Sequence, residues 1–138
     1  MIKILLDDGA KQPTRAYPTD AGMDLYSRED KIIPSRGGAR FDTGVHIGFE
    51  RGTYGKIESR SGLNMKNDVV SCGGTIDESY VGSIAVKLYN LSDKDYEVHK
   101  GDRIAQLVIM RYESPMMEIV DSLEETDRGS NGFGSSGV

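Results

Sequence analysis

The sequence has few of the residues that form disulfides or bind transition metals, and it has no long apolar run of the kind that spans a membrane. Cys72 is its single cysteine, so no internal disulfide is expected. With only His46 and His99 besides, we expect no zinc cluster and no functional role for either histidine. No apolar run approaches the roughly 20 residues of a membrane span, and the N-terminal strand-like segment is too brief for a secretory signal. These absences predict a soluble, cytoplasmic protein with no membrane partner.

Positive charge is also scarce. Lysine and arginine total 17 against 22 acidic residues, which gives a formal net charge of -5 and a pI near 5.0. Because proteins that bind duplex nucleic acid draw affinity from clustered cations, nucleic acid is not expected as a partner. A small phosphorylated ligand held by one or two arginines fits this balance. The length of 138 residues suits a single domain with its own core.

Short alternating segments replace helical periodicity in this chain. Apolar and polar residues alternate over 45–50 and 84–89, as they do in half-buried strands. The nearly continuous apolar run 104–110 predicts a strand covered on both faces, and turn signals recur at close spacing. The sequence therefore predicts an all-β barrel or sandwich.

One short helix is expected within this fold. Ser61 is predicted to cap it, with 62–66 as its turns and Asn67 near its end. Arg60 would lie at its start, where free N–H groups and a guanidinium suit phosphate oxygens. A capped surface turn with a solvated arginine is an equally good interpretation of this segment alone.

A glycine pair at 73–74 is a strong turn signal. It lies between the β-favouring pairs 69–70 and 75–76 and predicts a β-hairpin, whose exposed backbone could bind a flat polar ligand. Asp77 and Tyr80 follow closely enough for one ligand to meet a carboxylate and an aromatic ring. Taken alone, the same residues also fit an ordinary β-turn.

The tail 128–138 is rich in glycine and serine but carries Arg128 and Phe133. It lacks the lysine and the following helix of a phosphate-binding Walker A loop. Its composition fits a flexible terminus. It fits equally a mobile lid, with glycines as hinges, the arginine and serines for phosphate, and the phenylalanine for stacking.

Five segments, in order along the chain, resemble the motifs of the homotrimeric deoxyuridine triphosphatase (dUTPase) family. They are Ala21-Gly22-Met23-Asp24-Leu25-Tyr26-Ser27, Arg60-Ser61-Gly62-Leu63, Gly74-Thr75-Ile76-Asp77-Glu78-Ser79-Tyr80-Val81-Gly82, Gly101-Asp102-Arg103-Ile104-Ala105-Gln106-Leu107 and the tail from Arg128 to Gly137. One such match could arise by chance, whereas five in the family's order are specific.

The resemblance implies a jelly-roll-like, distorted β-barrel with a flexible C-terminal arm, assembled as a homotrimer whose active sites draw motifs from all three subunits. Residues 1–127 would form the barrel core, and 128–138 the arm that closes over the active site. The implied activity is that of a dUTP diphosphatase, which hydrolyses dUTP to dUMP and pyrophosphate with Mg²⁺. This reaction would limit uracil in DNA and supply dUMP for dTMP synthesis.

The matched motifs also imply a role for each residue. Asp77 would activate the water that attacks the α-phosphorus, Tyr80 would pack on deoxyribose where a ribose 2′-hydroxyl would collide, and Asp24 would support magnesium indirectly, through its water shell. The implied substrate-binding residues are Ser71, Gly74, Thr75 and Ile76 for the uracil edge, Arg60, Ser61, Gly62 and Gln106 for the phosphates, Phe133 for stacking on uracil, and Arg128, Gly134, Ser135 and Ser136 for closure over the outer phosphates.

A deaminase and a nucleotide-responsive regulatory protein are alternatives to hydrolysis. The related dCTP deaminases share the barrel and trimer, but deamination needs a glutamate in the strand after the third motif, and 83–88 contains none. A nucleotide-responsive protein, in which bound dUTP controls association with a regulatory protein partner, is compatible with the same residues and can coexist with hydrolysis.

Overall fold

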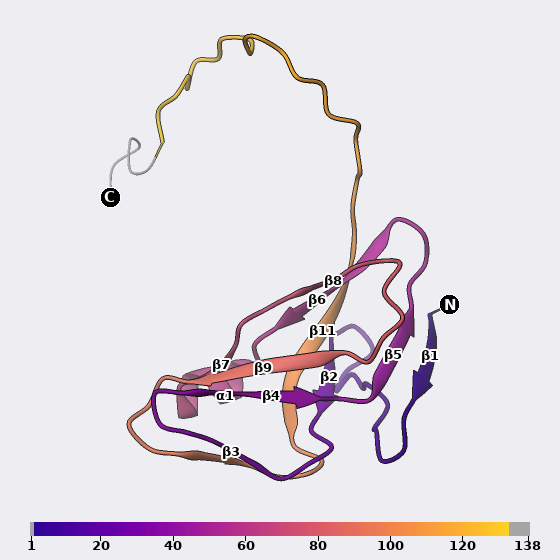
Figure 1. The fold of residues 1–138 in the computed structure, drawn as a ribbon, viewed down its shortest axis with the longest axis vertical. Coiled ribbons are helices and arrows are strands. Elements are labelled where there is room, and N and C mark those ends of the chain that lie inside the picture. Colours follow the sequence, from indigo (N-terminus) through magenta and orange to yellow (C-terminus); the bar gives the residue numbers. More distant parts are fainter. Residues whose placement is uncertain (1, 133–138) are drawn as a thin grey trace.

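The computed structural model describes residues 2–132, which fold into antiparallel strands with one short helix (Figure 1). The elements are β1 (Lys3–Leu6), β2 (Gly22–Tyr26), β3 (Lys31–Ile33), β4 (Gly38–Asp42), β5 (Val45–Gly48), β6 (Thr53–Glu58), α1 (Ser61–Asn67), β7 (Val69–Ser71), β8 (Thr75–Ile76), β9 (Ala85–Asn90), β10 (Tyr96–Val98) and β11 (Arg103–Arg111). The predicted all-β class with a single short helix is confirmed for these residues. None of them forms a helix long and apolar enough to span a bilayer.

The strands form four antiparallel ladders around one core. Their orders are β2-β11-β6-β8, β4-β9-β7, β1-β5 and β10-β3. The longest strand, β11, lies between β2 and β6, and its register places Gln106 opposite Asp24 on one side and Glu58 on the other. The ladder therefore places three segments that are distant in sequence side by side across the sheet.

Burial follows the predicted alternation except in β11. Alternate residues of 45–48 and 85–90 are buried, as expected for half-buried strands. In β11, Ile104 and Leu107 are buried whereas Met110 is 40% exposed, so the prediction that both faces are covered is wrong. Only one face of this sheet packs on the core, and apolar residues continue onto the other face.

The glycine pair at 73–74 turns the chain, but it does not form the predicted hairpin. β7 pairs with β9 and β8 pairs with β6, so the turn connects two different sheets. Gly73 and Gly74 have φ angles of 65° and 152°, which residues with side chains rarely adopt. The local turn signal is therefore right, whereas the pairing partners are set by the surrounding strands.

The helix starts one residue away from the predicted cap. Ser61 is its first residue, and Arg60 occupies the N-cap position with an extended backbone and no side-chain cap hydrogen bond. The prediction that Ser61 caps the helix is wrong, because the extended chain ends at Arg60, whose guanidinium binds Asp24 instead. The helix ends at Asn67 as predicted, and Asp68 follows in the left-handed conformation with φ of 53°.

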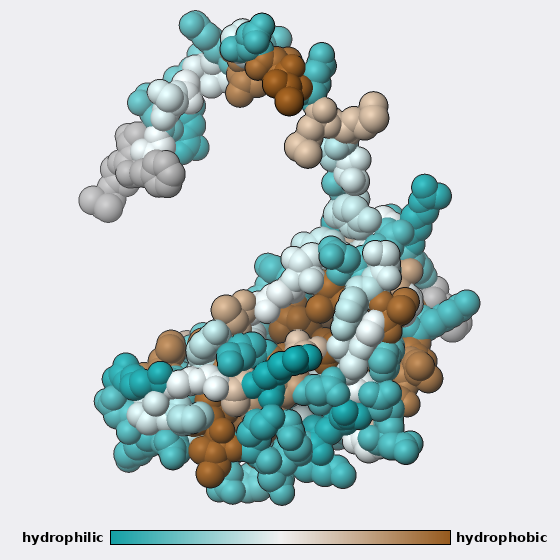
Figure 2. All heavy atoms as spheres, viewed as in Figure 1, coloured by the Kyte–Doolittle hydropathy of each residue, from teal (hydrophilic) through white to brown (hydrophobic). Residues whose placement is uncertain are grey.

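Beyond Arg111 the chain leaves the body of the molecule as an extended segment (Figure 1). Apolar side chains gather along it with little cover (Figure 2). Met116, Met117 and Ile119 are almost fully exposed, and Leu123 is largely so. The predicted boundary between a core at 1–127 and an arm at 128–138 stays a prediction.

Candidate active site

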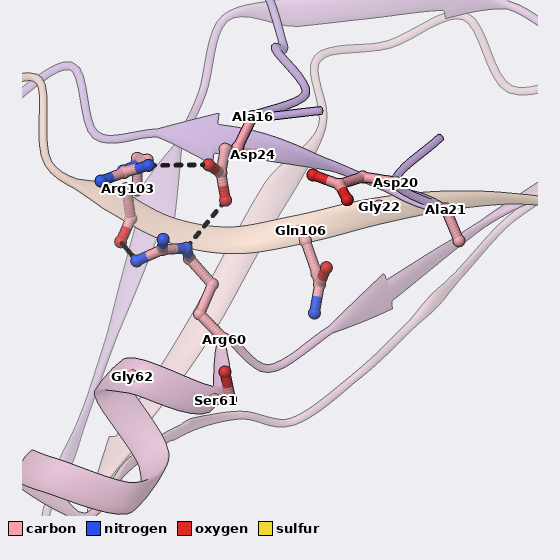
Figure 3. Close-up of a pocket in the computed structure, with 10 residues that line it drawn as sticks. All are labelled: Ala16, Asp20, Ala21, Gly22, Asp24, Arg60, Ser61, Gly62, Arg103 and Gln106. Carbon is pink, nitrogen blue, oxygen red and sulfur yellow. Dashed lines mark hydrogen bonds and ion pairs between the residues drawn. The ribbon is translucent and has the colours of Figure 1, made fainter. Parts of the chain in front are cut away.

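A pocket of about 340 Å³ lies between β2, β11 and the start of α1 (Figure 3). Its lining combines two arginines, two aspartates and small residues: Ala16, Asp20, Ala21, Gly22, Asp24, Arg60, Ser61, Gly62, Arg103 and Gln106. It contains Asp24 and all four residues that were predicted to hold phosphates.

Asp24 lies between two guanidinium groups. Its Oδ1 is 2.8 Å from Arg60 Nε and its Oδ2 is 3.3 Å from Arg103 Nη1, and the carboxylate side chain is only 15% exposed. Arg60 Nη1 also donates to the carbonyl of Arg103 at 3.5 Å, whereas Nη2 has no hydrogen-bond partner within residues 2–132. The aspartate thus orients Arg60 and leaves part of its donor fork for a ligand.

Gln106 projects from β11 between β2 and the start of α1 (Figure 3). Its Nε2 donates to the carbonyl of Ser59 at 2.9 Å, and its carboxamide lies so close to Gly22 that a Cβ there would collide with it. A side chain at position 22 would force the carboxamide of Gln106 to shift. Gln106 consequently braces the chain just before Arg60, a role that the sequence did not predict.

Two charged residues of the pocket, Asp20 and Arg103, were not predicted as site residues. Arg103 stands in the fourth matched motif and Asp20 immediately before the first, so position within a motif was the available signal. At these positions, an arginine or aspartate that contacts a ligand has the same sequence pattern as one that is a solvated surface charge. The finished pocket concentrates cationic donors and a serine hydroxyl, an arrangement that binds oxyanions.

The predicted uracil-binding segment 71–76 is tied to β6. Ser59 Oγ accepts from the Ser71 N–H at 2.9 Å, and Ile57 N–H donates to Gly74 O at 3.0 Å. β8 is the edge strand of its sheet, so one side of its backbone pairs with β6 and the other faces outward. The outward side offers main-chain donors and acceptors at Thr75 to a planar ligand.

Asp77 and Tyr80 lie on one turn directly after β8, closed by a hydrogen bond from Tyr80 N–H to Asp77 O at 3.0 Å. Both side chains are exposed, and neither lines the pocket of Arg60 and Asp24. Within one chain, the structure brings together the predicted phosphate residues but does not bring Asp77 or Tyr80 into their pocket.

Glu78 connects this turn to Tyr112, the first residue of the extended segment that follows β11. Its Oε2 accepts from Gly52 N–H at 2.6 Å and from the Tyr112 hydroxyl at 3.0 Å. The Glu78 carboxylate raises the pKa of Tyr112 above its ordinary value, first through this hydrogen bond. The residue after Asp77 is therefore connected to the point where the chain leaves the body.

The tail residues fall into two groups. Arg128 Nε donates to the carbonyl of Asn131 at 2.9 Å, a contact within the tail itself. The predicted residues Phe133, Gly134, Ser135 and Ser136 lie outside the described residues. For the part of the chain that is described, no three His, Cys, Asp or Glu side chains group into a metal cage.

Comparison with known proteins gives a consistent result. The family model described as dUTPase matches residues 8–137. A probable deoxyuridine 5′-triphosphate nucleotidohydrolase of Schizosaccharomyces pombe is 44% identical over 133 residues, covering 96% of this chain and 95% of that protein. The deoxyuridine 5′-triphosphate nucleotidohydrolase of Arabidopsis thaliana is 47% identical, covering 96% of this chain and 80% of its own length.

Solved structures agree with these sequence matches. The dUTPase of Staphylococcus bacteriophage 80alpha with dUpNHpp superposes with a TM-score of 0.91 at 31% identity, covering 100% of this chain and 99% of that one. A mutant dUTPase of phage phi11 of S. aureus, described as coordinating a structural Mg(II) ion, has a TM-score of 0.83 at 28% identity, covering 91% and 99%. The predicted jelly-roll-like fold is confirmed by these likenesses.

Proposed function

The chain belongs to the dUTPase family, and from that premise we propose that it hydrolyses dUTP to dUMP and pyrophosphate at a site built from the two residue groups described above. The observation that carries the proposal is the pocket in which Asp24 orients Arg60 beside Ser61 and Gln106. This pocket is suited to oxyanions and lies on the fold of the dUTPase family. β9 carries no carboxylate, which leaves no base-side acid for the deaminase alternative.

Arg60, Ser61, Gly62 and Gln106 hold the phosphate chain. Phosphoryl transfer asks a protein mainly for positioning and for stabilisation of charge on equatorial oxygens. Arg60 is fixed by Asp24 before substrate arrives, so its free donor needs little reorganisation on binding. Arg103 adds a second positive charge to the lining of the same pocket.

Asp77 is the general base that takes a proton from the attacking water. Its carboxylate is exposed, and it shares a turn with Tyr80, which packs against the sugar. The outward edge of β8, with Ser71, Gly74, Thr75 and Ile76 around it, binds the uracil edge. One short segment thereby positions the base, the sugar and the attacking water.

The residues present fit an indirect magnesium role. Both carboxylate oxygens of Asp24 are engaged by arginines, so this acid is suited to the water shell of a metal rather than to direct ligation. Mg²⁺ held with the substrate phosphates would neutralise the charge that develops as pyrophosphate leaves. Asp24, for its part, holds Arg60 and Arg103 around that charge.

Three copies share each site in this proposal. Asp77 and Tyr80 lie outside the pocket of Arg60, and a second copy that presents its own turn to that pocket would join the two halves. The exposed apolar residues Met116, Met117 and Ile119 also require cover that this chain alone does not give them. Arg128, Phe133, Gly134, Ser135 and Ser136 close over the bound nucleotide as an arm.

Pyrophosphate release from dUTP, dTTP, dCTP and UTP, with magnesium and with a chelator, tests the function. We expect turnover of dUTP alone, dependent on magnesium. Absence of dUTP turnover in the full chain would refute hydrolysis, and turnover of UTP at the dUTP rate would refute the role of Tyr80 in sugar selection.

A regulatory protein partner stays a prediction from the sequence. Its test is capture of a partner by the full chain with and without a non-hydrolysable dUTP analogue. Release of the partner by the analogue supports it, and capture that is unaffected by nucleotide contradicts it.

A further inference from the structure

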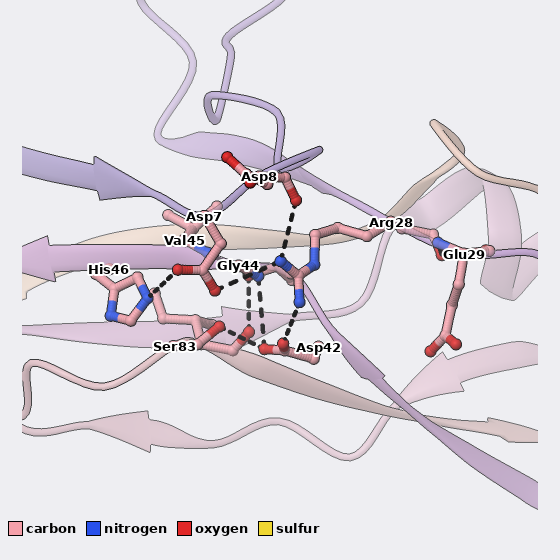
Figure 4. A network of polar contacts seen from close by, with 12 residues as sticks. Asp7, Asp8, Arg28, Glu29, Asp42, Gly44, Val45, His46 and Ser83 are labelled. Carbon is pink, nitrogen blue, oxygen red and sulfur yellow. Dashed lines mark hydrogen bonds and ion pairs between the residues drawn. The ribbon is translucent and has the colours of Figure 1, made fainter.

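A closed set of polar contacts surrounds the segment 81–83, directly after Tyr80. On one side His46, from β5, lies with Nδ1 2.8 Å from Val81 O. Its Nε2 is 3.2 Å from Asp7 Oδ1 (Figure 4). The two ring nitrogens therefore connect the segment after Tyr80 to the end of β1.

The same contacts return to the segment from the other side. Arg28 lies with Nη1 3.4 Å from Asp7 Oδ2 and Nη2 2.6 Å from Asp42 Oδ2, and Ser83 Oγ donates a short hydrogen bond to Asp42 Oδ1 (Figure 4). From Asp7 through Arg28 and Asp42, the contacts end on Ser83, two residues after the carbonyl that His46 binds. We call these five side chains, His46, Asp7, Arg28, Asp42 and Ser83, the 81–83 clasp.

The position of Tyr80 depends on the segment inside the clasp. The Tyr80 hydroxyl donates to the Ser83 carbonyl at 3.0 Å. Its ring lies so close to Gly82 that a Cβ there would collide with the ring carbons. The ring is exposed and is held by these two contacts with the following backbone, so whatever fixes 81–83 also fixes the ring.

The partners of His46 favour its protonated form in this geometry. A carbonyl oxygen faces Nδ1 and a carboxylate oxygen faces Nε2, and both are acceptors. A neutral imidazole has one N–H and would leave a lone pair facing an acceptor. Only the imidazolium donates at both nitrogens and satisfies both contacts.

We propose that His46, in its imidazolium form, is a positioning residue that holds the 81–83 segment and thereby sets the orientation of Tyr80 and the preference for deoxyribose over ribose. The inference rests on the proposed contact between Tyr80 and the sugar. It assigns a part in substrate discrimination to a histidine that is outside the proposed substrate-binding residues and for which the sequence predicted no role.

The charges around His46 favour this form. Asp7 and Asp42 are the acids that face it, Arg28 lies beyond them, and Lys3 of β1 lines the same groove. The Val81 carbonyl, and then the Asp7 carboxylate, raise the pKa of His46 above its ordinary value, while partial burial opposes them. With the pKa raised, the clasp is complete below it and loses one contact as the pH rises through it.

Steady-state kinetics with dUTP and UTP between about pH 5.5 and 9 test the proposal, because this range spans the titration of histidine. The quantity to follow is the ratio of kcat/KM for dUTP to kcat/KM for UTP, since ionisations that act equally on both substrates cancel in it. We expect the wild-type ratio to fall with rising pH. In His46→Gln it should be about tenfold lower at low pH, through weaker selection at the sugar, and independent of pH.

His99→Gln is the matched control, since His99 also lies near two acids, Glu97 and Asp102, but far from Tyr80 in sequence and on a different turn. This variant should keep the wild-type ratio and its pH dependence. A His46→Gln ratio that matches the His99→Gln ratio at every pH would overturn the proposal.

Two further variants separate the possible failures. Ser83→Ala opens the clasp from its other side and should lower the ratio while leaving its pH dependence; an unchanged ratio counts against the proposal even if His46→Gln does not fold. Tyr80→Ala tests the premise. If Tyr80→Ala keeps the preference for dUTP, the proposed sugar contact is wrong; if it loses the preference and His46→Gln keeps it, only the positioning role is wrong.

Discussion

Asp77 is a residue whose chemical role can be separated from folding. It is exposed, and its carboxylate has no hydrogen-bond partner among the described residues, so removing the charge disturbs no contact of the fold. Asp77→Asn should lower kcat for dUTP by about 10²- to 10⁴-fold, the usual contribution of a positioned general base. Pyrophosphate release measures this loss.

Binding provides the control for that variant. The KM for dUTP and the midpoint of thermal unfolding should stay near their wild-type values, because the amide keeps the shape of the side chain. Near-normal turnover would remove Asp77 from the role of base.

Gly22 tests the packing that shapes the phosphate pocket. A Cβ at this position would overlap the carboxamide of Gln106, which lies across the ladder from β2. Gly22→Ala should lower the free energy of unfolding by about 1–3 kcal/mol, the range for overpacking, and should raise the KM for dUTP as Gln106 moves. Urea denaturation and steady-state kinetics measure the two effects.

The matched control is Gly48→Ala, another strand glycine. Its added Cβ would meet Lys3 at an ordinary 3.6 Å, and its φ is not in the left-handed region. If the two alanine variants prove equally stable, the contact with Gln106 does not constrain position 22.

Residues of the site could be predicted from the sequence where they belong to a matched motif. The residues that they pair with in the structure could not be predicted. Asp24 and Arg60 were both predicted, but as a magnesium support and a phosphate ligand rather than as an ion pair. They are 36 residues apart, and only the β2-β11-β6 ladder brings them together. Arg103 was missed because an arginine at a strand end has the same sequence pattern whether it is solvated or paired.

At the scale of elements, the described part of the C-terminal tail is nearly independent of the barrel. Arg128 and Gly129 form hydrogen bonds with Asn131 and Thr126, inside the tail. A chain ending at Asp127 should therefore unfold at the wild-type temperature yet lose most dUTP turnover, because the proposed closing residues are removed. Calorimetry and pyrophosphate release measure the two properties.

Comparison of two truncations sharpens this test. Ending the chain at Gly132 removes Phe133, Ser135 and Ser136 but keeps Arg128. Full activity in either truncated protein would contradict the closing role of the residues removed from it.

Helices and strands were predicted well where the local sequence pattern determines them. The alternation in β5 and β9 and the helix end at Asn67 follow from side-chain periodicity and helix length, and the structure confirms them. The pairing across the 73–74 turn was wrong, because a turn signal fixes where the chain reverses but not which strand lies beside it.

At the scale of the whole molecule, the exposed apolar segment and the divided site lead to the same expectation. Met116 and Ile119 are uncovered, and the turn of Asp77 is absent from the pocket of Arg60. Both observations are accounted for if copies of the chain assemble and exchange surfaces. Neither could be derived from strand periodicity, which describes one chain at a time.

Mixing two inactive variants tests whether subunits share a site. Asp77→Asn removes the proposed base and Arg60→Ala removes the proposed phosphate contact, so each variant alone should be inactive. In trimers that refold from an equal mixture, a site formed by two subunits is intact when one supplies Asp77 and its neighbour supplies Arg60. Random assembly gives this combination at about a quarter of the sites, so about a quarter of the wild-type rate should return.

A site contained within one chain gives a different outcome. Each chain in the mixture would still lack one of the two residues, and no activity would return at any ratio. The rate should also peak at equal proportions of the two variants, because the fraction of intact sites is the product of their two fractions. A rate that stays at the level of the separate variants would contradict shared sites, even if the protein sediments as a trimer.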